Sequence, residues 1–265
     1  MASRTPKVAV IAGPNGAGKS TIAPALLCDV FGIREFVNAD VIARGMSAFD
    51  PDSAAIAAGR VMLSRLHELA EARADFAFET TLASRSFAPW IAKLRDSDYF
   101  FHLAFVWIPS PDVSVARVRH RVASGGHHVP DDVVRRRYER GIDNFFRLYR
   151  PIADRWRVLD NTARGAPRLI AEGRGDDEIV VLDPRIWNIM KPPDLIRERA
   201  PLREPFDDTE AVLRAAARGV REALRRHKLL GESIASWENG RVVEIKAEDI
   251  VLPPEIPPES SFAKT

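Results

Sequence analysis

The sequence predicts an α/β fold in which helices flank a mostly parallel sheet, and three observations predict it. First, the segment 13–21, Gly-Pro-Asn-Gly-Ala-Gly-Lys-Ser-Thr, follows a buried apolar strand, 7–12. Second, apolar strands alternate with amphipathic helices up to about residue 165, which is typical of right-handed βαβ units. Third, polar residues follow the strands at the edge where such sheets bind their ligands.

The segment 13–21 fills every fixed position of a P-loop, the phosphate-binding motif G-x-x-x-x-G-K-[ST], between a strand and a helix. Small residues let successive backbone N–H groups point at phosphate oxygens, and the following helix adds its positive end. Lys19 would reach the outer phosphates, and the Ser20 hydroxyl would hold Mg²⁺. We therefore predict a P-loop NTPase or kinase fold with ATP and Mg²⁺ as cofactors. The predicted nucleotide contacts are Gly13, Asn15, Gly16, Ala17, Gly18, Lys19, Ser20 and Thr21.

The first half of the chain continues this alternation. A helix over 18–31 leaves the P-loop and carries Cys28 on its apolar side, so we expect a thiol packed in the core. A long helix over 53–74 has a capping Asp or Ser at its start and one apolar side. The strands expected in this half are short apolar runs that end at polar residues, and they lie at 7–12, 35–38 and 75–78.

The second half begins with helix 86–94 and the strand 99–108, which is apolar enough for the centre of a sheet. A Pro-Ser-Pro-Asp turn then starts a new helix, and a Gly-Gly-His-His loop separates that helix from the next one. Further elements are expected as helices at 112–124 and 131–149, and as strands at 156–159, 169–171 and 179–182.

Composition divides the chain into four parts. Residues 1–190 form the predicted P-loop kinase domain, and the proline-rich, charged segment 191–206 forms a linker. Residues 207–252 form a C-terminal appendage of one Ala/Arg/Leu-rich helix and a hairpin, which an Asn-Gly pair at 239–240 indicates. The proline-rich residues 253–265 form a loose tail.

Composition also excludes several classes of protein. With 265 residues and a net charge of +2, the chain can bury a large core, and it does not bind polyanions through bulk charge. Its single cysteine allows no intrachain disulfide and no cysteine-based zinc cluster. The N-terminus has no signal-peptide-like apolar region, and the longest apolar run is too short to span a membrane. We expect a cytoplasmic protein without membrane association, and nucleic acid is disfavoured as a partner.

Two acidic residues follow strands at the expected ligand edge. Asp40 would take the proton of an attacking hydroxyl or help to place Mg²⁺; the alternative is a cap for the next helix. Glu79 would order Mg²⁺ through water or accept hydrogen bonds from a substrate, with Thr80 beside it. The alternative for Glu79 is a solvated strand end.

Arginines are dense in the helices that follow. Arg117 and Arg121 are four residues apart and share one helix face, where paired cations would clamp a phosphoryl group in transfer. The alternative is a solvated basic face. On the next helix, Arg137 flanks the buried stripe and is the arginine best placed to reach inward. His128, in the loop between these helices, would touch phosphate or substrate.

The combination of a P-loop, Asn38-Ala39-Asp40, Phe78-Glu79-Thr80-Thr81 and an arginine-bearing helix resembles the zeta-toxin family of P-loop kinases. The run from Phe76 to Arg85 and the Gly-Gly-His at 125–127 look like the chromosomal bacterial members. The resemblance covers about residues 1–165. The family's best-studied members use ATP to phosphorylate an amino-sugar hydroxyl of UDP-N-acetylglucosamine, which depletes a cell-wall precursor, and an antitoxin holds them in check.

The resemblance implies Lys19 and Ser20 for ATP–Mg²⁺, Asp40 as base, Glu79 and Thr80 as substrate contacts, and Arg117 as a phosphate-stabilising arginine. The family has a second arginine where this chain has histidines, and Arg121 or Arg137 would substitute for it. The predicted catalytic residues are thus Asp40, Lys19, Arg117 and Arg121. The predicted substrate-binding residues are Asp40, Glu79, Thr80, Arg85, His128 and Arg137.

We therefore predict an ATP-dependent kinase of zeta-toxin type that acts on a phosphate-bearing small molecule, with a protein antitoxin as a further partner. Two other functions stay open. One is a kinase of another acceptor, such as a nucleic-acid end, a nucleoside or an antibiotic. The other is a nucleotide-dependent switch or binding module that consumes no acceptor.

Overall fold

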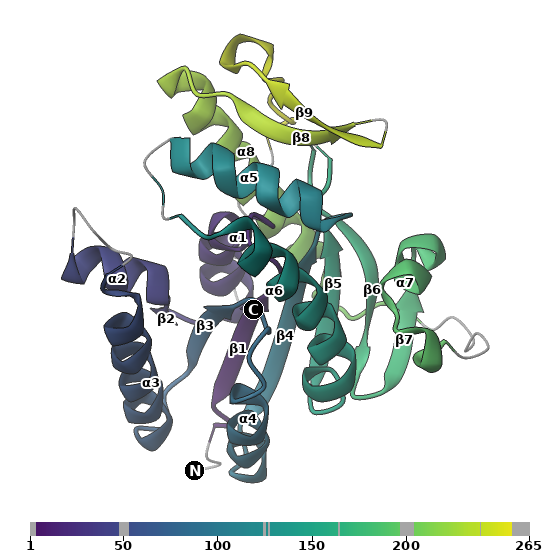
Figure 1. Cartoon of the computed structure of the whole chain (residues 1–265). Coiled ribbons are helices and arrows are strands. Elements are labelled where there is room, and N and C mark those ends of the chain that lie inside the picture. The colour runs from purple at the N-terminus through teal and green to yellow at the C-terminus, as the bar shows by residue number, and fades with distance from the viewer. Residues whose placement is uncertain are drawn as a thin grey trace, which may run out of the picture.

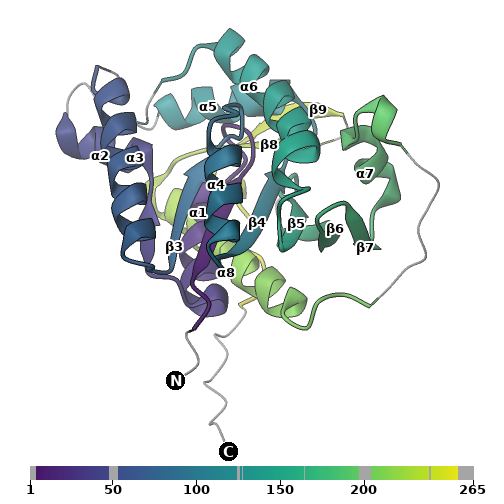
Figure 2. The ribbon, with the colours of Figure 1, turned by 90° about the horizontal axis from the view of Figure 1, so that it is seen from below.

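A computed structural model of the chain describes residues 4–47, 53–123, 126, 128–163, 165–196, 204–238 and 240–255. Within them, a central sheet lies between two layers of helices, and a hairpin lies beyond one end of the sheet (Figures 1 and 2). The middle of the predicted linker, most of the predicted tail, the loop residues Gly125 and His127, and Asn239 of the hairpin turn lie outside the described residues. None of the helices in these ranges has the length and hydropathy of a membrane span.

The seven-stranded sheet has the order β2-β3-β1-β4-β5-β6-β7. The first five strands in this order are parallel, β6 pairs antiparallel with β5, and β7 pairs antiparallel with β6. The predicted mostly parallel sheet is thus confirmed. β1 lies between β3 and β4, and the chain therefore crosses over β1, which makes its carboxyl end the expected ligand site. The strands are β1 (Lys7–Ala12), β2 (Glu35–Val37), β3 (Phe76–Thr80), β4 (Phe100–Trp107), β5 (Arg155–Asp160), β6 (Arg168–Arg174) and β7 (Asp177–Val181).

The helices divide between the two faces of the sheet. One apolar core joins α3, α4, η2 and α7 to one face, and a second core joins α1, η1 and α8 to the other. The helices are α1 (Lys19–Ala25), η1 (Leu26–Phe31), α2 (Ala39–Met46), α3 (Ala55–Glu71), α4 (Phe87–Asp96), α5 (Pro111–Ala123), α6 (Asp131–Asn144), η2 (Phe145–Tyr149), α7 (Pro184–Met190), η3 (Pro193–Leu195), α8 (Thr209–Leu230) and η4 (Ala247–Asp249).

The prediction of one continuous helix over 18–31 is wrong in its second half, and the prediction of a buried thiol at Cys28 is also wrong. α1 ends at Ala25, and the chain continues as the π-helical segment η1. A π-helix takes more residues per turn than an α-helix, so the side chains after Ala25 no longer follow the α-helical spacing. Leu26, Leu27 and Phe31 stay buried, whereas Cys28 is exposed.

The predicted C-terminal helix and hairpin are present and pack directly against the P-loop helix. Val220 of α8 and Ile22 of α1 belong to one apolar core. At Gly219 a Cβ atom would lie 2.5 Å from the carbonyl oxygen of Thr21, so the two helices approach more closely than a side chain would allow. Beyond α8, β8 (Ile234–Glu238) and β9 (Arg241–Ile245) form the antiparallel hairpin.

A buried histidine in β4 makes stability depend on pH. His102 stacks on Phe31, with ring centroids 4.6 Å apart, and burial together with the charges of Arg157 and Lys7 lowers its pKa to about 3. In the unfolded chain the pKa of this imidazole is near 6.5, so the unfolded state takes up a proton that the folded state does not bind. The free energy of unfolding therefore decreases as the pH falls from 6.5 towards 3. His102 changes the free energy of unfolding by at most about 1.4 kcal/mol per pH unit.

We therefore expect the variant His102→Leu to have a flatter dependence of unfolding free energy on pH than the wild type over the mildly acidic range. Urea denaturation at a series of pH values measures both curves. Parallel curves would show that another group takes up the proton on unfolding.

Candidate active site

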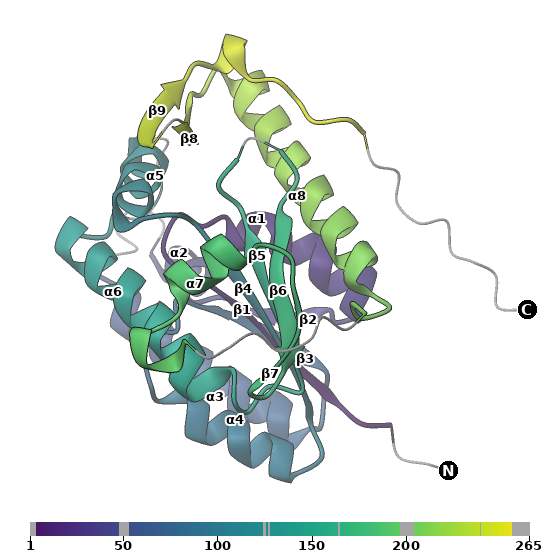
Figure 3. The ribbon, with the colours of Figure 1, turned by 90° about the vertical axis from the view of Figure 1, so that its right-hand side faces the viewer.

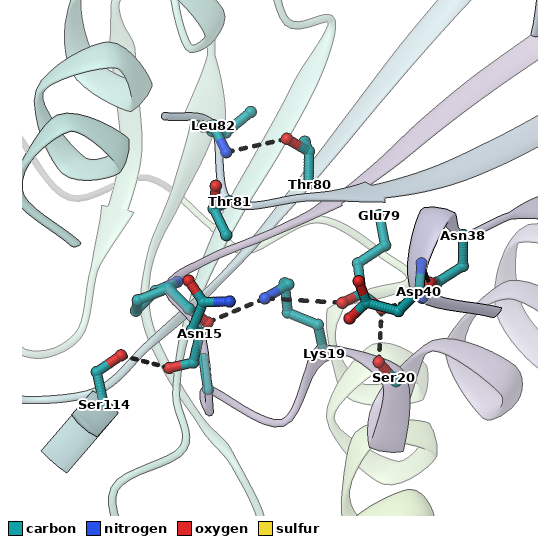
Figure 4. Close-up of polar contacts among 12 residues, drawn as sticks. Asn15, Lys19, Ser20, Asn38, Asp40, Glu79, Thr80, Thr81, Leu82 and Ser114 are labelled. Atoms are coloured by element: carbon teal, nitrogen blue, oxygen red, sulfur yellow. Dashed lines mark hydrogen bonds and ion pairs between the residues drawn. The ribbon is translucent and has the colours of Figure 1, made fainter. Parts of the chain in front are cut away.

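The P-loop connects β1 to α1 and lies against β4 and α5. At Gly13, where φ is 135°, a Cβ atom would lie 2.2 Å from the carbonyl oxygen of Val106 in β4. Lys19 is buried, and its Nζ donates a hydrogen bond of 2.9 Å to the carbonyl oxygen of Pro14. The hydroxyl of Ser114 in α5 donates a 2.5 Å hydrogen bond to the carbonyl oxygen of Asn15 (Figure 4). The loop is thus fixed by contacts from its own lysine and from α5.

Glu79 connects three elements at the carboxyl edge of the sheet. Its Oε2 accepts hydrogen bonds from the Ser20 hydroxyl at 2.7 Å and from Asn38 Nδ2 at 3.0 Å. Its Oε1 lies 3.7 Å from Nζ of Lys19 (Figure 4). The parallel register explains this position, because Glu79 in β3 is opposite Ile11 in β1, the strand that enters the loop.

Asp40 is in the first turn of α2, where Asn38 rather than Asp40 caps the helix. Asn38 Oδ1 accepts hydrogen bonds from the backbone N–H groups of Asp40 at 2.8 Å and Val41 at 3.2 Å. The carboxylate of Asp40 is therefore not used as the cap, and the residue is exposed. The charge of Asp40 acts on Lys19, so its carboxylate lies within electrostatic range of that lysine (Figure 4).

The charged side chains of the site affect the pKa of Lys19. Burial lowers the pKa of Lys19, the charges of Glu79 and Asp40 oppose that effect, and the charge of Arg121 adds to it. Two acids and an arginine from three separate elements therefore lie within electrostatic range of the P-loop lysine. Such a mixture of charges suits a phosphate ligand that needs cations and a hydroxyl that needs a base.

The two arginines of α5 that were predicted as catalytic, Arg117 and Arg121, have different surroundings. The guanidinium of Arg117 donates hydrogen bonds to the backbone carbonyl oxygens of Gly16 at 3.4 Å, Asn161 at 3.1 Å and Thr162 at 3.2 Å. Burial lowers the pKa of Arg117 to about 10. Arg117 thus joins α5 to the P-loop and to the segment after β5, and Arg121, one turn later, is the arginine whose charge acts on Lys19.

The remaining predicted substrate residues make no hydrogen bond or ion pair with this cluster in the described part of the chain. The hydroxyl of Thr80 accepts a 3.1 Å hydrogen bond from the backbone N–H of Leu82. Arg85 and His128 are exposed, and Arg137 is half-buried on α6. Among the described residues, no hydrogen bond or ion pair joins these last three side chains to Lys19, Asp40 or Glu79.

Three residues that support the site were not among the predicted site residues. Asn38 holds both Glu79 and the start of α2, and an Asn directly before a helix is a capping signal that sequence could have provided. Ser114 holds Asn15, and Nδ2 of Asn161 donates a 2.8 Å hydrogen bond to the carbonyl oxygen of Ala17. Asn161 follows β5 at the edge where ligands are expected, so its position after a strand was a signal, whereas no local pattern predicts the contact of Ser114.

The site has the ligand chemistry that Mg²⁺ prefers. Ser20 is exposed here, and a hydroxyl oxygen is a hard ligand for this ion. Within the described ranges, no group of three or more His, Cys, Asp or Glu side chains gathers in a metal site.

A family model described as an AAA domain matches residues 8–148. The chain belongs to this AAA-domain family. The match runs from β1 to η2 and includes the P-loop, Asp40, Glu79, Arg117 and Arg121. An uncharacterised protein of Haemophilus influenzae (strain ATCC 51907 / DSM 11121 / KW20 / Rd) is 29% identical over 126 residues, which are 48% of this chain and 88% of the relative.

Solved structures share the fold of this AAA-domain protein. A crystal structure of AvrRxo1-ORF1 with AvrRxo1-ORF2 and sulphate ions has a TM-score of 0.57 at 16% identity, covering 74% of this chain. The chain spans 66% of that relative, just under two thirds. The same complex with ATP has a TM-score of 0.55 at 18% identity, with 84% and 76% of the two chains covered. The PezAT chromosomal toxin–antitoxin system of Streptococcus pneumoniae has a TM-score of 0.50 at 16% identity, with 84% and 89% covered. These likenesses confirm the predicted P-loop fold, which the chain shares with a protein of a chromosomal toxin–antitoxin system.

Proposed function

We propose that this chain is an ATP-dependent kinase that transfers the γ-phosphoryl group of ATP to a hydroxyl group of a small molecule. The observation that carries the proposal is the exposed carboxylate of Asp40 beside the buried Lys19. A phosphoryl donor bound in the P-loop would have its outer phosphates at Lys19, and a base at that point serves an attacking hydroxyl. Glu79, already engaged by Ser20 and Asn38, is less free to act as that base.

The proposed reaction forms a bond from the acceptor oxygen to the γ-phosphorus and breaks the bond from that phosphorus to the oxygen that leaves with ADP. The hydroxyl proton goes to Asp40. The N–H groups of the P-loop and Lys19 bind the phosphates, and Arg121 supplies positive charge along the path of transfer. Ser20 would hold Mg²⁺, which neutralises phosphate charge when it is bound.

The finer parts of the proposal rest on likeness rather than on contacts. ATP is the proposed donor because a structure with the same fold was solved with ATP. A sugar nucleotide such as UDP-N-acetylglucosamine is the proposed acceptor on the resemblance to zeta toxins, with Thr80, Arg85, His128 and Arg137 as contacts for it. A protein antitoxin is the proposed partner, because a neighbour belongs to a toxin–antitoxin system.

We expect the purified chain with ATP and Mg²⁺ to add one phosphoryl group to a sugar nucleotide. The experiment incubates it with separate panels of sugar nucleotides, nucleosides, aminoglycosides and oligonucleotides, and mass spectrometry follows each acceptor and ATP. Phosphate on a member of another panel would keep the kinase and replace its acceptor. Conversion of ATP to ADP at the same rate with and without every acceptor would contradict the proposed transfer.

A further inference from the structure

Helix α5 is held on two sides. On the sheet side, Ser114 and Arg117 hydrogen-bond the P-loop, and at Gly16 a Cβ atom would lie 2.8 Å from that of Arg117. On its other side, the C-terminal hairpin β8–β9 lies along α5 (Figures 1 and 3). The helix that carries Arg121 is therefore enclosed between the nucleotide loop and a segment more than a hundred residues later in the sequence.

A polar chain of three side chains joins the helix to the hairpin. His120 Nε2 lies 2.7 Å from the hydroxyl oxygen of Ser233, and that hydroxyl lies 2.5 Å from Oε1 of Glu244. A carboxylate only accepts, so the Ser233 hydroxyl donates to Glu244 and its oxygen accepts from His120. His120 is the residue directly before Arg121, so this chain fixes the backbone that carries the arginine.

The hairpin is in turn connected to the P-loop helix through α8. At Gly219, α8 packs closely against the carbonyl oxygen of Thr21, in the first helical turn after the P-loop. At the N-terminal end of α8, the hydroxyl of Thr209 donates a 2.6 Å hydrogen bond to Glu172, which pairs with Arg157 in β5. Glu172 is fully buried, so this end is joined to the sheet by contacts that water does not reach. The hairpin therefore has a fixed base from which to hold α5.

We propose that the C-terminal hairpin is a brace for α5, and that His120, Ser233 and Glu244 are positioning residues that keep Arg121 at the P-loop before any nucleotide binds. The kinetic consequence rests on the proposed kinase function, whereas the brace itself does not. Charge that is already in place when the reaction starts costs no rearrangement in the transition state. A loosened brace leaves the loop and its lysine intact and makes the arginine less ordered.

Hydrogen exchange of the full chain without nucleotide tests the brace. We expect Ser233→Ala and Glu244→Ala to speed amide exchange in peptides of α5 about tenfold, because each variant removes one hydrogen bond to a charged group. Peptides of β1 should exchange at the wild-type rate. Ser233→Thr, which keeps the hydroxyl, should exchange as the wild type does. Glu248→Ala removes an exposed acid of the same appendage and serves as the matched control. Unchanged exchange in α5, or an equal rise in every peptide, would overturn the brace.

Steady-state kinetics test the positioning role. We expect Ser233→Ala to lower kcat for phosphoryl transfer several-fold, with an unchanged KM for ATP. Ser233→Thr, which keeps the hydroxyl, should have the wild-type kcat. A normal kcat together with faster exchange in α5 would overturn the positioning of Arg121. If the wild type transfers no phosphate, the proposed function fails, and the exchange experiment alone still decides whether the hairpin braces α5.

Discussion

Asp40→Asn is expected to lower the rate of phosphoryl transfer by about a thousandfold while ATP affinity stays close to that of the wild type. General base catalysis contributes roughly 10²–10⁴ in rate, and an amide of the same shape takes up no proton. The affinity persists because Asp40 makes no hydrogen bond to the P-loop among the residues that the structure describes. Helix α2 persists because Asn38 is its cap. Transfer kinetics and calorimetric titration with ATP measure the two quantities on the same preparation.

The matched control for this variant is Asp132→Asn. Asp132 is also an exposed acid in the first turn of a helix, α6, so its replacement changes the charge and the helix terminus in the same way. We expect it to transfer phosphate at the wild-type rate. A normal rate in Asp40→Asn, or an equal loss in both variants, would remove Asp40 from the role of base.

Lys19→Met is expected to weaken ATP binding about a hundredfold and to bring transfer below detection. The substitution removes a buried cation that lies beside Glu79 and would donate a hydrogen bond to the ATP phosphates. A charge-assisted hydrogen bond contributes about 1.5–3 kcal/mol. Methionine has a similar length and leaves the loop packed, so the loss comes from charge. Titration with ATP measures it, and Lys93→Met, at an exposed lysine of α4, is the control. Wild-type affinity in Lys19→Met would mean that the triphosphate binds elsewhere.

The loop and the edge of the sheet could be predicted because their determinants are local. The P-loop is a run of nine residues, and its position between a strand and a helix follows from the apolar pattern on either side. Parallel strands end at the same edge, so residues after separate strands, such as Asp40 and Glu79, are expected near one another. The proximity of both acids to Lys19 in the structure agrees with that expectation.

The parts that sequence did not predict depend on contacts between distant segments. The π-helical turns of η1, which expose Cys28, break the spacing from which the apolar side of helix 18–31 was inferred. The hydrogen bonds of Arg117 to three backbone carbonyls depend on how α5 packs across the P-loop and the segment after β5, and no residue pattern encodes that packing. The position of the hairpin on α5 likewise follows from the path of α8.

The fate of a labelled phosphoryl group tests the central claim most directly. ATP with heavy oxygen in its γ-phosphoryl group is incubated with the chain, Mg²⁺ and a small-molecule extract, and mass spectrometry finds where the label goes. The proposed kinase predicts that the label enters a phosphomonoester of a small molecule, with the wild type and not with Asp40→Asn. Label found only in inorganic phosphate, in equal amounts for both proteins, would contradict an acceptor hydroxyl activated at Asp40.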